Sequence, residues 1–175
     1  MKLQPGKTNT FMKTITHSFN YQIFDSETEL PPDDRILLAD ARDAISSSYS
    51  PYSQYHVGAA VRMQNGEIVR GSNQENASFP AGSCAERVAL FAAASAFPGN
   101  PVEAIAITAK SAAFPVLEPV TPCGICRQAL VEFELRFQHN IRLILSGEKG
   151  RIFIIDGIQA LLPLAFMEKK LMKKP

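Results

Sequence analysis

The chain has 175 residues and a net charge of +1, from 18 lysine and arginine residues against 17 aspartate and glutamate residues. A nearly neutral chain lacks the basic field that favours nucleic acid, no apolar run approaches the roughly 18 residues of a membrane span, and residues 1–10 lack the apolar stretch of a secretory signal. We therefore expect one cytoplasmic domain, in which the three cysteines indicate a metal site rather than disulfides.

The first part of the chain is expected to hold an arm, a helix and a hairpin. Apolar and polar residues alternate weakly over 14–19, which suggests a strand, and two consecutive prolines close the segment. From Asp33 an amphipathic helix is expected, because apolar residues recur every three or four positions and two acids favour its positive end. Residues 57–63 and 68–73 are β-rich and joined through an Asn-Gly dipeptide, which predicts two antiparallel strands.

The rest of the chain alternates between helices and strands. Helices are expected over 84–97 and 124–138, and strands over 104–109, 141–145 and 152–155. Both strand-helix-strand passages should be parallel crossovers, whereas the last connection is too short for a helix and must return antiparallel. The prediction is an α/β fold, a three-layer α/β/α sandwich with a mixed five-stranded sheet whose last two strands are antiparallel.

The three cysteines have the pattern of an open zinc site. Cys84 begins one predicted helix, and Cys123 and Cys126 are three residues apart at the start of the next, so they share a face. Three thiolates leave the fourth tetrahedral position of zinc free for water. Glu86 reaches that water as a proton shuttle only if Cys84 sits at the helix entry. Arg87 is placed to donate hydrogen bonds to the ligand sulfurs and to offset their charge.

The same residues also have structural interpretations. A lone Cys-x-x-Cys pair is also typical of redox sites, and an isolated buried cysteine is usually a small core residue. A structural zinc site would need a fourth ligand, and none of His17, His56 and His139 has ligand spacing to a cysteine. A non-catalytic zinc module would keep the cysteines but would not need Glu86.

Four segments, in order along the chain, resemble the motifs of the cytidine deaminase family, in the compact branch whose zinc ligands are all cysteines. They are residues 49–60, residues 71–78, Cys-Ala-Glu-Arg at 84–87 and Pro-Cys-Gly-Ile-Cys-Arg-Gln at 122–128. The similar region covers about 33–166, which leaves an N-terminal arm at 1–32 and a lysine-rich tail at 167–175. We expect the tail to be solvated and disordered.

The resemblance implies a hydrolase. Its reaction would be zinc-dependent deamination of cytidine or deoxycytidine to uridine or deoxyuridine with release of ammonia, in pyrimidine salvage. One Zn²⁺ per subunit would be held by the three cysteines, with Glu86 as the catalytic acid and base. The substrate-binding residues that it implies are Asn73, Glu75, Tyr55, Ala85 and Phe166.

Within that set, Asn73 and Glu75 would hold the sugar hydroxyls, and the alternative is a strand-ending turn capped by Asn73. Tyr55 and Phe166 match positions that stack on the pyrimidine in relatives, the latter from a neighbouring subunit, although either side chain suits a core. Phe79 matches an aromatic residue at a subunit boundary. The resemblance therefore implies a homotetramer, with a dimer as the alternative.

Departures from the family pattern leave the substrate preference open. Tyr55 stands where the family commonly has phenylalanine, and His56 where it often has proline, so cytidine, deoxycytidine and a modified nucleoside all remain candidates. The expected partner is a small pyrimidine nucleoside, with neither nucleic acid nor membrane. A polynucleotide deaminase would usually have a basic surface and a helix between the fourth and fifth strands, and the sequence predicts neither.

Overall fold

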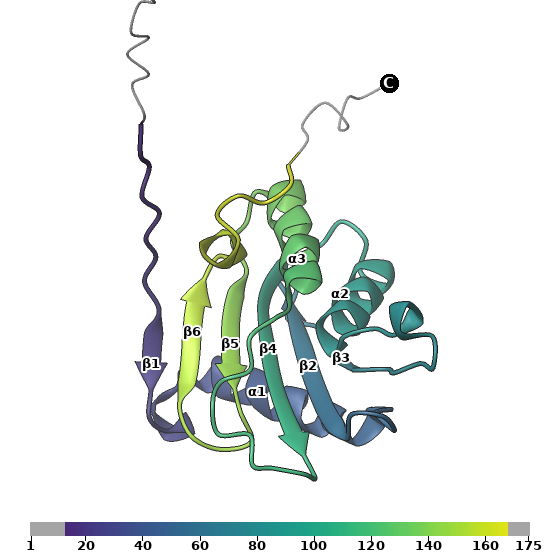
Figure 1. Ribbon diagram of the computed structural model, residues 1–175. Coiled ribbons are helices and arrows are strands. Elements are labelled where there is room, and N and C mark those ends of the chain that lie inside the picture. Colours follow the sequence, from purple (N-terminus) through teal and green to yellow (C-terminus); the bar gives the residue numbers. More distant parts are fainter. Residues whose placement is uncertain (1–12, 168–175) are drawn as a thin grey trace, which may run out of the picture.

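The computed structural model describes residues 13–167. In this part of the chain one six-stranded sheet, in the order β1-β6-β5-β4-β2-β3, carries helices on both faces (Figure 1). The strands are β1 Gln22–Phe24, β2 Tyr55–Met63, β3 Ile68–Ser72, β4 Val102–Ser111, β5 Arg142–Ser146 and β6 Ile152–Asp156. The main helices are α1 Pro32–Ala44, α2 Ala85–Ala96 and α3 Gly124–Phe137. No helix among residues 13–167 is both long and apolar enough to span a membrane.

The strand directions agree with the predicted mixed sheet. β2 is antiparallel to both β3 and β4, so β3 and β4 point the same way, and β4 and β5 pair in parallel. β5 and β6 are antiparallel, and the residues between them, 147–151, form no helix. The two helical passages therefore join strands of the same direction, and the last connection reverses the chain as expected.

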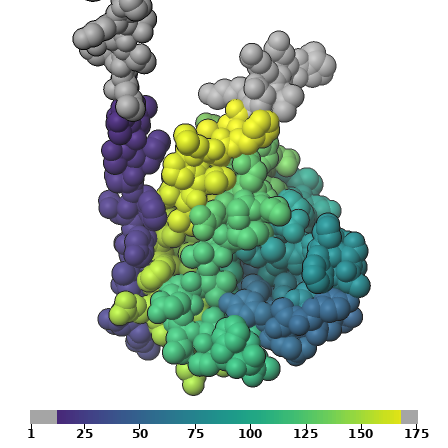
Figure 2. All heavy atoms as spheres, in the orientation of Figure 1, coloured from purple at the N-terminus to yellow at the C-terminus, as the bar shows by residue number. Residues whose placement is uncertain are grey.

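The sheet has six strands rather than the predicted five. The additional strand, β1, lies in the arm and pairs antiparallel with β6. Residues 14–19, for which the sequence suggested a strand, form none. Three residues are too few for a periodicity signal, and the strand forms because the edge of β6 offers free backbone groups. Tyr21 packs on Phe153 with ring centroids 5.0 Å apart. The described arm residues form a purple ridge along one side of the molecule (Figure 2).

Both faces of the sheet are buried, which produces three layers. On one face α1 packs Leu37, Leu38 and Ala41 against alternate residues of the central strands, among them Ala60 and Ala106. The neighbouring strand positions point to the other face, where α2 and α3 cover them; these strand residues include Ala59, Val61, Ile105, Ile107, Leu143 and Leu145. The central strands are therefore apolar at nearly every position rather than alternating.

Two glycines let the helices approach β2 and β3 closely. A side-chain carbon on Gly58 would overlap the carbonyl oxygen of Ala41 in α1, and one on Gly71 would overlap the backbone nitrogen of Ala89 in α2. Backbone atoms of packed helices have little freedom to move aside. The positions of α1 and α2 on the sheet therefore depend on glycine at these two points.

We expect Gly58→Ala to lower the free energy of unfolding by about 3 kcal/mol, because the added methyl group forces α1 away from the sheet. Gly124→Ala is the matched control, since at that position no atom lies within 4 Å of the added carbon apart from the chain neighbours and the local backbone of α3. Urea denaturation of the two zinc-loaded variants measures the difference. Equal stability of the Gly58 and Gly124 variants would contradict this account of the packing.

Candidate active site

The three cysteines meet where two helices begin. Cys84 is the N-cap residue of α2 and Cys123 is the N-cap residue of α3, with Cys126 in the first turn of α3. The Sγ atoms of Cys84 and Cys123 are 3.8 Å apart, and those of Cys123 and Cys126 are 3.6 Å apart. All three sulfurs lie within 4.8 Å of one another. The helix entry that the sequence required of Cys84 is therefore confirmed.

This group fits a zinc ion. Zinc held tetrahedrally at about 2.3 Å from each sulfur separates the sulfurs by about 3.8 Å, close to the spacing found here. Interactions with Cys126, Cys123 and Arg87 lower the pKa of Cys84 below that of an ordinary thiol, which favours the thiolate form that zinc binds. Among the described residues no histidine or carboxylate joins the group. Three donors thus leave one zinc position for another ligand.

Arg87 lies beside the sulfurs on the first turn of α2. Burial lowers the pKa of its guanidinium, but interactions with the Cys84 and Cys126 sulfurs together raise it, and the net shift is upward. Its Nη2 donates to the carbonyl oxygen of Gly82 at 3.5 Å. Its Nε is buried without a hydrogen-bond partner. A cation in this place offsets the negative charge of a cluster of thiolates.

Glu86 is buried next to the cysteine group. It lies in the first turn of α2 with 5% of its surface exposed. Burial, and then the negative charge of Cys84, raise the pKa of Glu86 above that of an ordinary glutamate. A carboxyl group with a raised pKa holds a proton more firmly than a surface glutamate, which suits a residue that takes up and returns protons.

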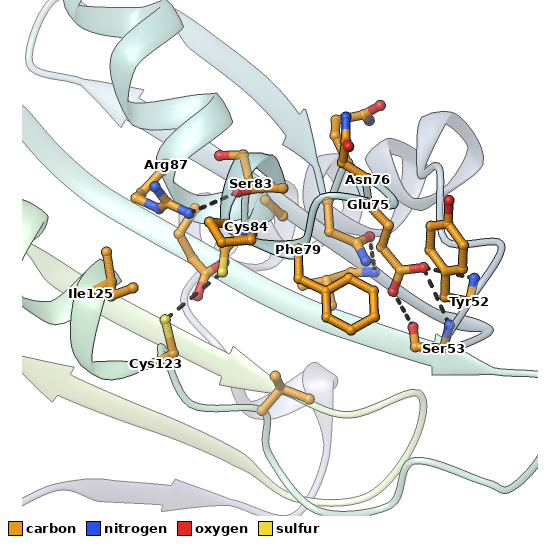
Figure 3. Close-up of a pocket in the computed structure, with 18 of the residues that line it drawn as sticks. Tyr52, Ser53, Glu75, Asn76, Phe79, Ser83, Cys84, Arg87, Cys123 and Ile125 are labelled. Atoms are coloured by element: carbon orange, nitrogen blue, oxygen red, sulfur yellow. Dashed lines mark hydrogen bonds between the residues drawn. The ribbon is translucent and has the colours of Figure 1, made fainter.

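The cysteine group opens into a cavity of about 790 Å³. Figure 3 shows Cys84, Arg87 and Cys123 at one end, with Glu75, Ser53 and Tyr52 at the other and Phe79 between them. Glu86, Ala85 and Asn73 also line it. The cavity therefore joins a metal-binding end to a polar end, and its volume is in the range of small-molecule sites.

Residues 32–138 match the family model of the cytidine and deoxycytidylate deaminase zinc-binding region. The chain belongs to this deaminase family. It is 40% identical to the cytidine deaminase of Halalkalibacterium halodurans, over 77% of this chain and 94% of that protein. It is 36% identical to that of Sporosarcina psychrophila, over 77% and 92%. A crystal structure of the cytidine deaminase from Burkholderia pseudomallei superposes with a TM-score of 0.65 at 34% identity, over 75% and 97% of the two chains.

Family membership and the cysteine group together make the protein a zinc-dependent deaminase, and zinc is its cofactor. The predicted family, fold class and enzyme class are confirmed. The rejected alternatives, a redox pair and a buried core cysteine, do not explain why three sulfurs meet beside a buried carboxyl group.

At the polar end of the deaminase cavity, Glu75 is fixed by the segment before β2. Its Oε2 accepts hydrogen bonds from the backbone N–H groups of Tyr52 (2.9 Å) and Ser53 (3.2 Å), and its Oε1 accepts one from the Ser53 hydroxyl. The hydrogen bond from the Ser53 side chain is the largest cause that lowers the pKa of Glu75. The carboxylate is therefore ionised, oriented and still partly exposed to the cavity.

Asn73 is held by β2 and by a neighbouring serine. Its Oδ1 accepts from the backbone N–H of Val57 (2.8 Å) and from the hydroxyl of Ser48 (2.6 Å), while its Nδ2 donates to the carbonyl oxygen of Tyr55 (2.9 Å). An amide nitrogen has two hydrogens, so one remains for a ligand. The structural role that the sequence offered for Asn73 is therefore present, and because the residue also lines the cavity, its contact with a substrate stays a prediction.

The other predicted substrate residues are placed differently. Ala85 is fully buried and lines the cavity. Tyr55 stacks on Phe114 with centroids 6.1 Å apart and lines a separate hollow beside residues 114–121. The Phe166 side chain is 70% exposed and lies outside the cavity of its own chain. The single chain therefore brings Asn73, Glu75 and Ala85 to the cavity, but neither of the two aromatic rings.

The sequence reading missed the residues that hold Glu75. Ser53 supplies both a backbone N–H and a hydroxyl, and Tyr52 supplies a second N–H and packs edge-on against Phe79. Both lie in the segment 49–60, whose similarity to the family was clear, but only the fold shows that this segment reaches Glu75.

Proposed function

We propose that this deaminase acts on cytidine or deoxycytidine, converting it with one water molecule to uridine or deoxyuridine and ammonia. The observation that carries the proposal is one cavity with a three-cysteine group and the buried Glu86 at one end and the oriented Glu75 and Asn73 at the other. The base would lie against the cysteine end and the sugar against the polar end. The names of the relatives agree with this assignment.

We assign the zinc-binding role to Cys84, Cys123 and Cys126. When bound there, zinc supplies Lewis acidity that makes hydroxide available at neutral pH for addition to C4 of the base. The role proposed for Arg87, to offset the negative charge of the sulfurs, follows from its place beside Cys84 and Cys126.

Glu86 moves the protons of the reaction. Its carboxylate takes up the proton that water loses and delivers it to ring N3, which makes C4 more electrophilic. The carboxylate then takes the proton of the hydroxyl group now on C4 and passes it to the amino group, so that the C4 carbonyl forms, the C–N bond breaks and ammonia leaves. The burial that raises the pKa of Glu86 keeps this proton from exchanging freely with solvent.

The polar end selects a sugar. Glu75 accepts and Asn73 donates, so the two side chains together bind a hydroxyl group that is both donor and acceptor. Ser53 and Tyr52 hold the Glu75 carboxylate before substrate arrives, which lowers the entropy cost of binding. Because this end of the cavity would bind a sugar, the substrate proposed is a nucleoside rather than a free base.

We expect Glu75→Ala to raise the KM for cytidine by about tenfold, because a hydrogen bond to a charged group contributes about 1.5 kcal/mol, while kcat changes little. Steady-state kinetics by ammonia release measures both constants. Glu67→Ala, an exposed site in the β2–β3 turn, is the matched control and should behave as the wild type. An unchanged KM in the Glu75 variant would remove its assigned role.

The assembly proposed is a homotetramer, or else a dimer, in which a second copy covers the rim of the cavity. Several large apolar side chains near the rim or on the C-terminal segment are exposed: Phe79 (77%), Ile125 (65%), Leu164 (88%) and Phe166 (70%). The Phe166 backbone is fixed by two hydrogen bonds to the Gln128 side-chain amide, so its ring projects from a defined place. In that assembly Phe166 would stack on the base in a neighbouring cavity. Light scattering that found a fully active monomer would exclude this arrangement.

The proposed organisation is an arm at 1–32, a deaminase domain at 33–166 and a tail at 167–175, in the cytoplasm. All the cavity residues lie within 33–166, and the three cysteines are unpaired thiols, which stay reduced in the cytoplasm. The expectation of a disordered tail falls on residues that lie, apart from Met167, outside the described part of the chain.

Release of ammonia from cytidine by the purified, zinc-loaded protein tests the function. Turnover that depends on zinc would support a nucleoside deaminase, and comparison with deoxycytidine would then rank the two sugars. Tight binding of cytidine without release of ammonia would instead indicate a non-catalytic zinc module.

A further inference from the structure

A chain of side-chain hydrogen bonds leads from Asn73 away from the cavity to His56. Ser48 Oγ donates to Asn73 Oδ1 at 2.6 Å, and Ser48 Oγ lies 3.2 Å from both Ser50 Oγ and His56 Nδ1. Ser50 Oγ is 2.7 Å from His56 Nδ1. Ser50 is 3% exposed, so one member of this chain is cut off from solvent.

The number of available protons fixes the direction of these bonds. Asn73 Oδ1 only accepts, so the single hydroxyl proton of Ser48 is committed to it. Ser48 can therefore only accept from its other neighbours, Ser50 and His56. When His56 Nδ1 carries a proton it donates to the serines, Ser50 donates to Ser48, and every contact in the chain is a hydrogen bond. With an unprotonated Nδ1, the Ser50 proton turns to the ring, and Ser48 Oγ accepts from neither Ser50 nor His56.

His56 also lies, along β2, between the two residues whose backbone groups are hydrogen-bonded to the Asn73 side-chain amide. On β2 it is flanked by Tyr55, whose carbonyl oxygen accepts from Asn73 Nδ2, and by Val57, whose N–H donates to Asn73 Oδ1. The ring of His56 and the backbone on either side of it therefore act on the same amide. No other described histidine has a link of this kind to the cavity; His139, for example, contacts Gln64 at 3.4 Å.

We propose that His56 is a positioning residue for substrate binding: through Ser50 and Ser48 it fixes the amide of Asn73, and with it the donor presented to the sugar. The inference rests on the proposed function, since it assigns the sugar to Asn73. His56 does not touch the cavity itself, so its effect is indirect. Because the sugar is remote from the reacting C4 and amino group, His56 acts on substrate binding more than on the chemical step.

Two substitutions separate hydrogen bonding from packing. His56→Phe keeps a ring but removes Nδ1, and His56→Asn places a polar atom near the position of Nδ1. We expect the phenylalanine variant to raise the KM for cytidine and the Kd for uridine about fivefold, which is the effect of losing one hydrogen bond, with kcat within about twofold. The asparagine variant should restore most of the wild-type KM. His139→Ala is the control and should leave both constants unchanged.

A second measurement does not depend on turnover. In ¹⁵N-labelled zinc-loaded protein, the Asn73 side-chain hydrogens should exchange with water about fivefold faster in His56→Phe than in the wild type, and at nearly the wild-type rate in His56→Asn. Ser50→Ala, which breaks the chain at a small residue, replaces the phenylalanine variant if that protein fails to fold and should show the same faster exchange.

These outcomes distinguish a failure of the proposed function from a failure of the role proposed for His56. Wild-type protein that neither deaminates cytidine nor binds uridine would overturn the proposed function, while the exchange of the Asn73 amide would still decide the role of His56. Active protein whose KM and amide exchange are unchanged in His56→Phe, or an asparagine variant as impaired as the phenylalanine variant, would overturn the proposal for His56.

Discussion

Glu86→Gln is expected to lower kcat for cytidine by about 10³-fold while the protein keeps its zinc. The amide has nearly the shape of the carboxyl group, but it cannot take up the proton of water or deliver one to the base, and general acid–base catalysis of this kind contributes about 10²–10⁴-fold. Glu86 is not among the three clustered sulfur ligands, so metal content should not change. Ammonia release and metal analysis of the same preparation measure both properties.

Glu134→Gln is the matched control for this experiment. Glu134 is also buried in a helix, with 3% exposed, but it lies outside the cavity. Its Oε1 accepts the backbone N–H groups of Ile141 and Ile158, and glutamine retains that acceptor. The control should keep kcat within about twofold. A Glu86 variant that turned over cytidine at the rate of this control would remove Glu86 from the mechanism.

Cys123→Ala is expected to lose both zinc and activity. Two remaining thiols hold zinc poorly, and metal affinity is linked to folding, so the variant should also unfold at a lower temperature than the wild type. Treatment of the wild type with a strong chelator should produce the same loss of activity. Metal analysis after dialysis, together with thermal denaturation, measures the two effects.

Ile125→Ala is the control for metal content, because Ile125 lies between the two cysteines of α3 with 65% of its surface exposed and has no atom that binds zinc. It should retain one zinc per chain. A Cys123 variant that also retained one zinc would show that the ligands are assigned wrongly.

The metal site could be predicted because its signal is local. Cys123 and Cys126 share a face through their spacing alone, and the requirement that Cys84 begin a helix followed from the two-residue distance to Glu86. Most helices and strands were also predictable, since long apolar periodic segments such as α2 and β4 carry strong signals.

What could not be predicted depends on contacts between distant segments. β1 has three residues, and its formation depends on the free edge of β6 rather than on its own pattern. The support of Glu75 by Ser53 joins positions 22 residues apart. Tyr55 and Phe166 lie outside the cavity of a single chain, and no pattern along one sequence shows whether a second copy brings such rings to the site.

Because the N-termini of α2 and α3 meet at the cysteines, a zinc ion bound there also cross-links the two helices. Cys84 and Cys123 are 39 positions apart and lie on different helices, so a metal bound to both is a cross-link that closes a loop of that length. Closing such a loop in the unfolded chain costs about 4 kcal/mol of conformational entropy. The ion that supplies the chemistry therefore also clamps the second helix to the third, and the resistance of this molecule to heat should follow the zinc supply of the cell.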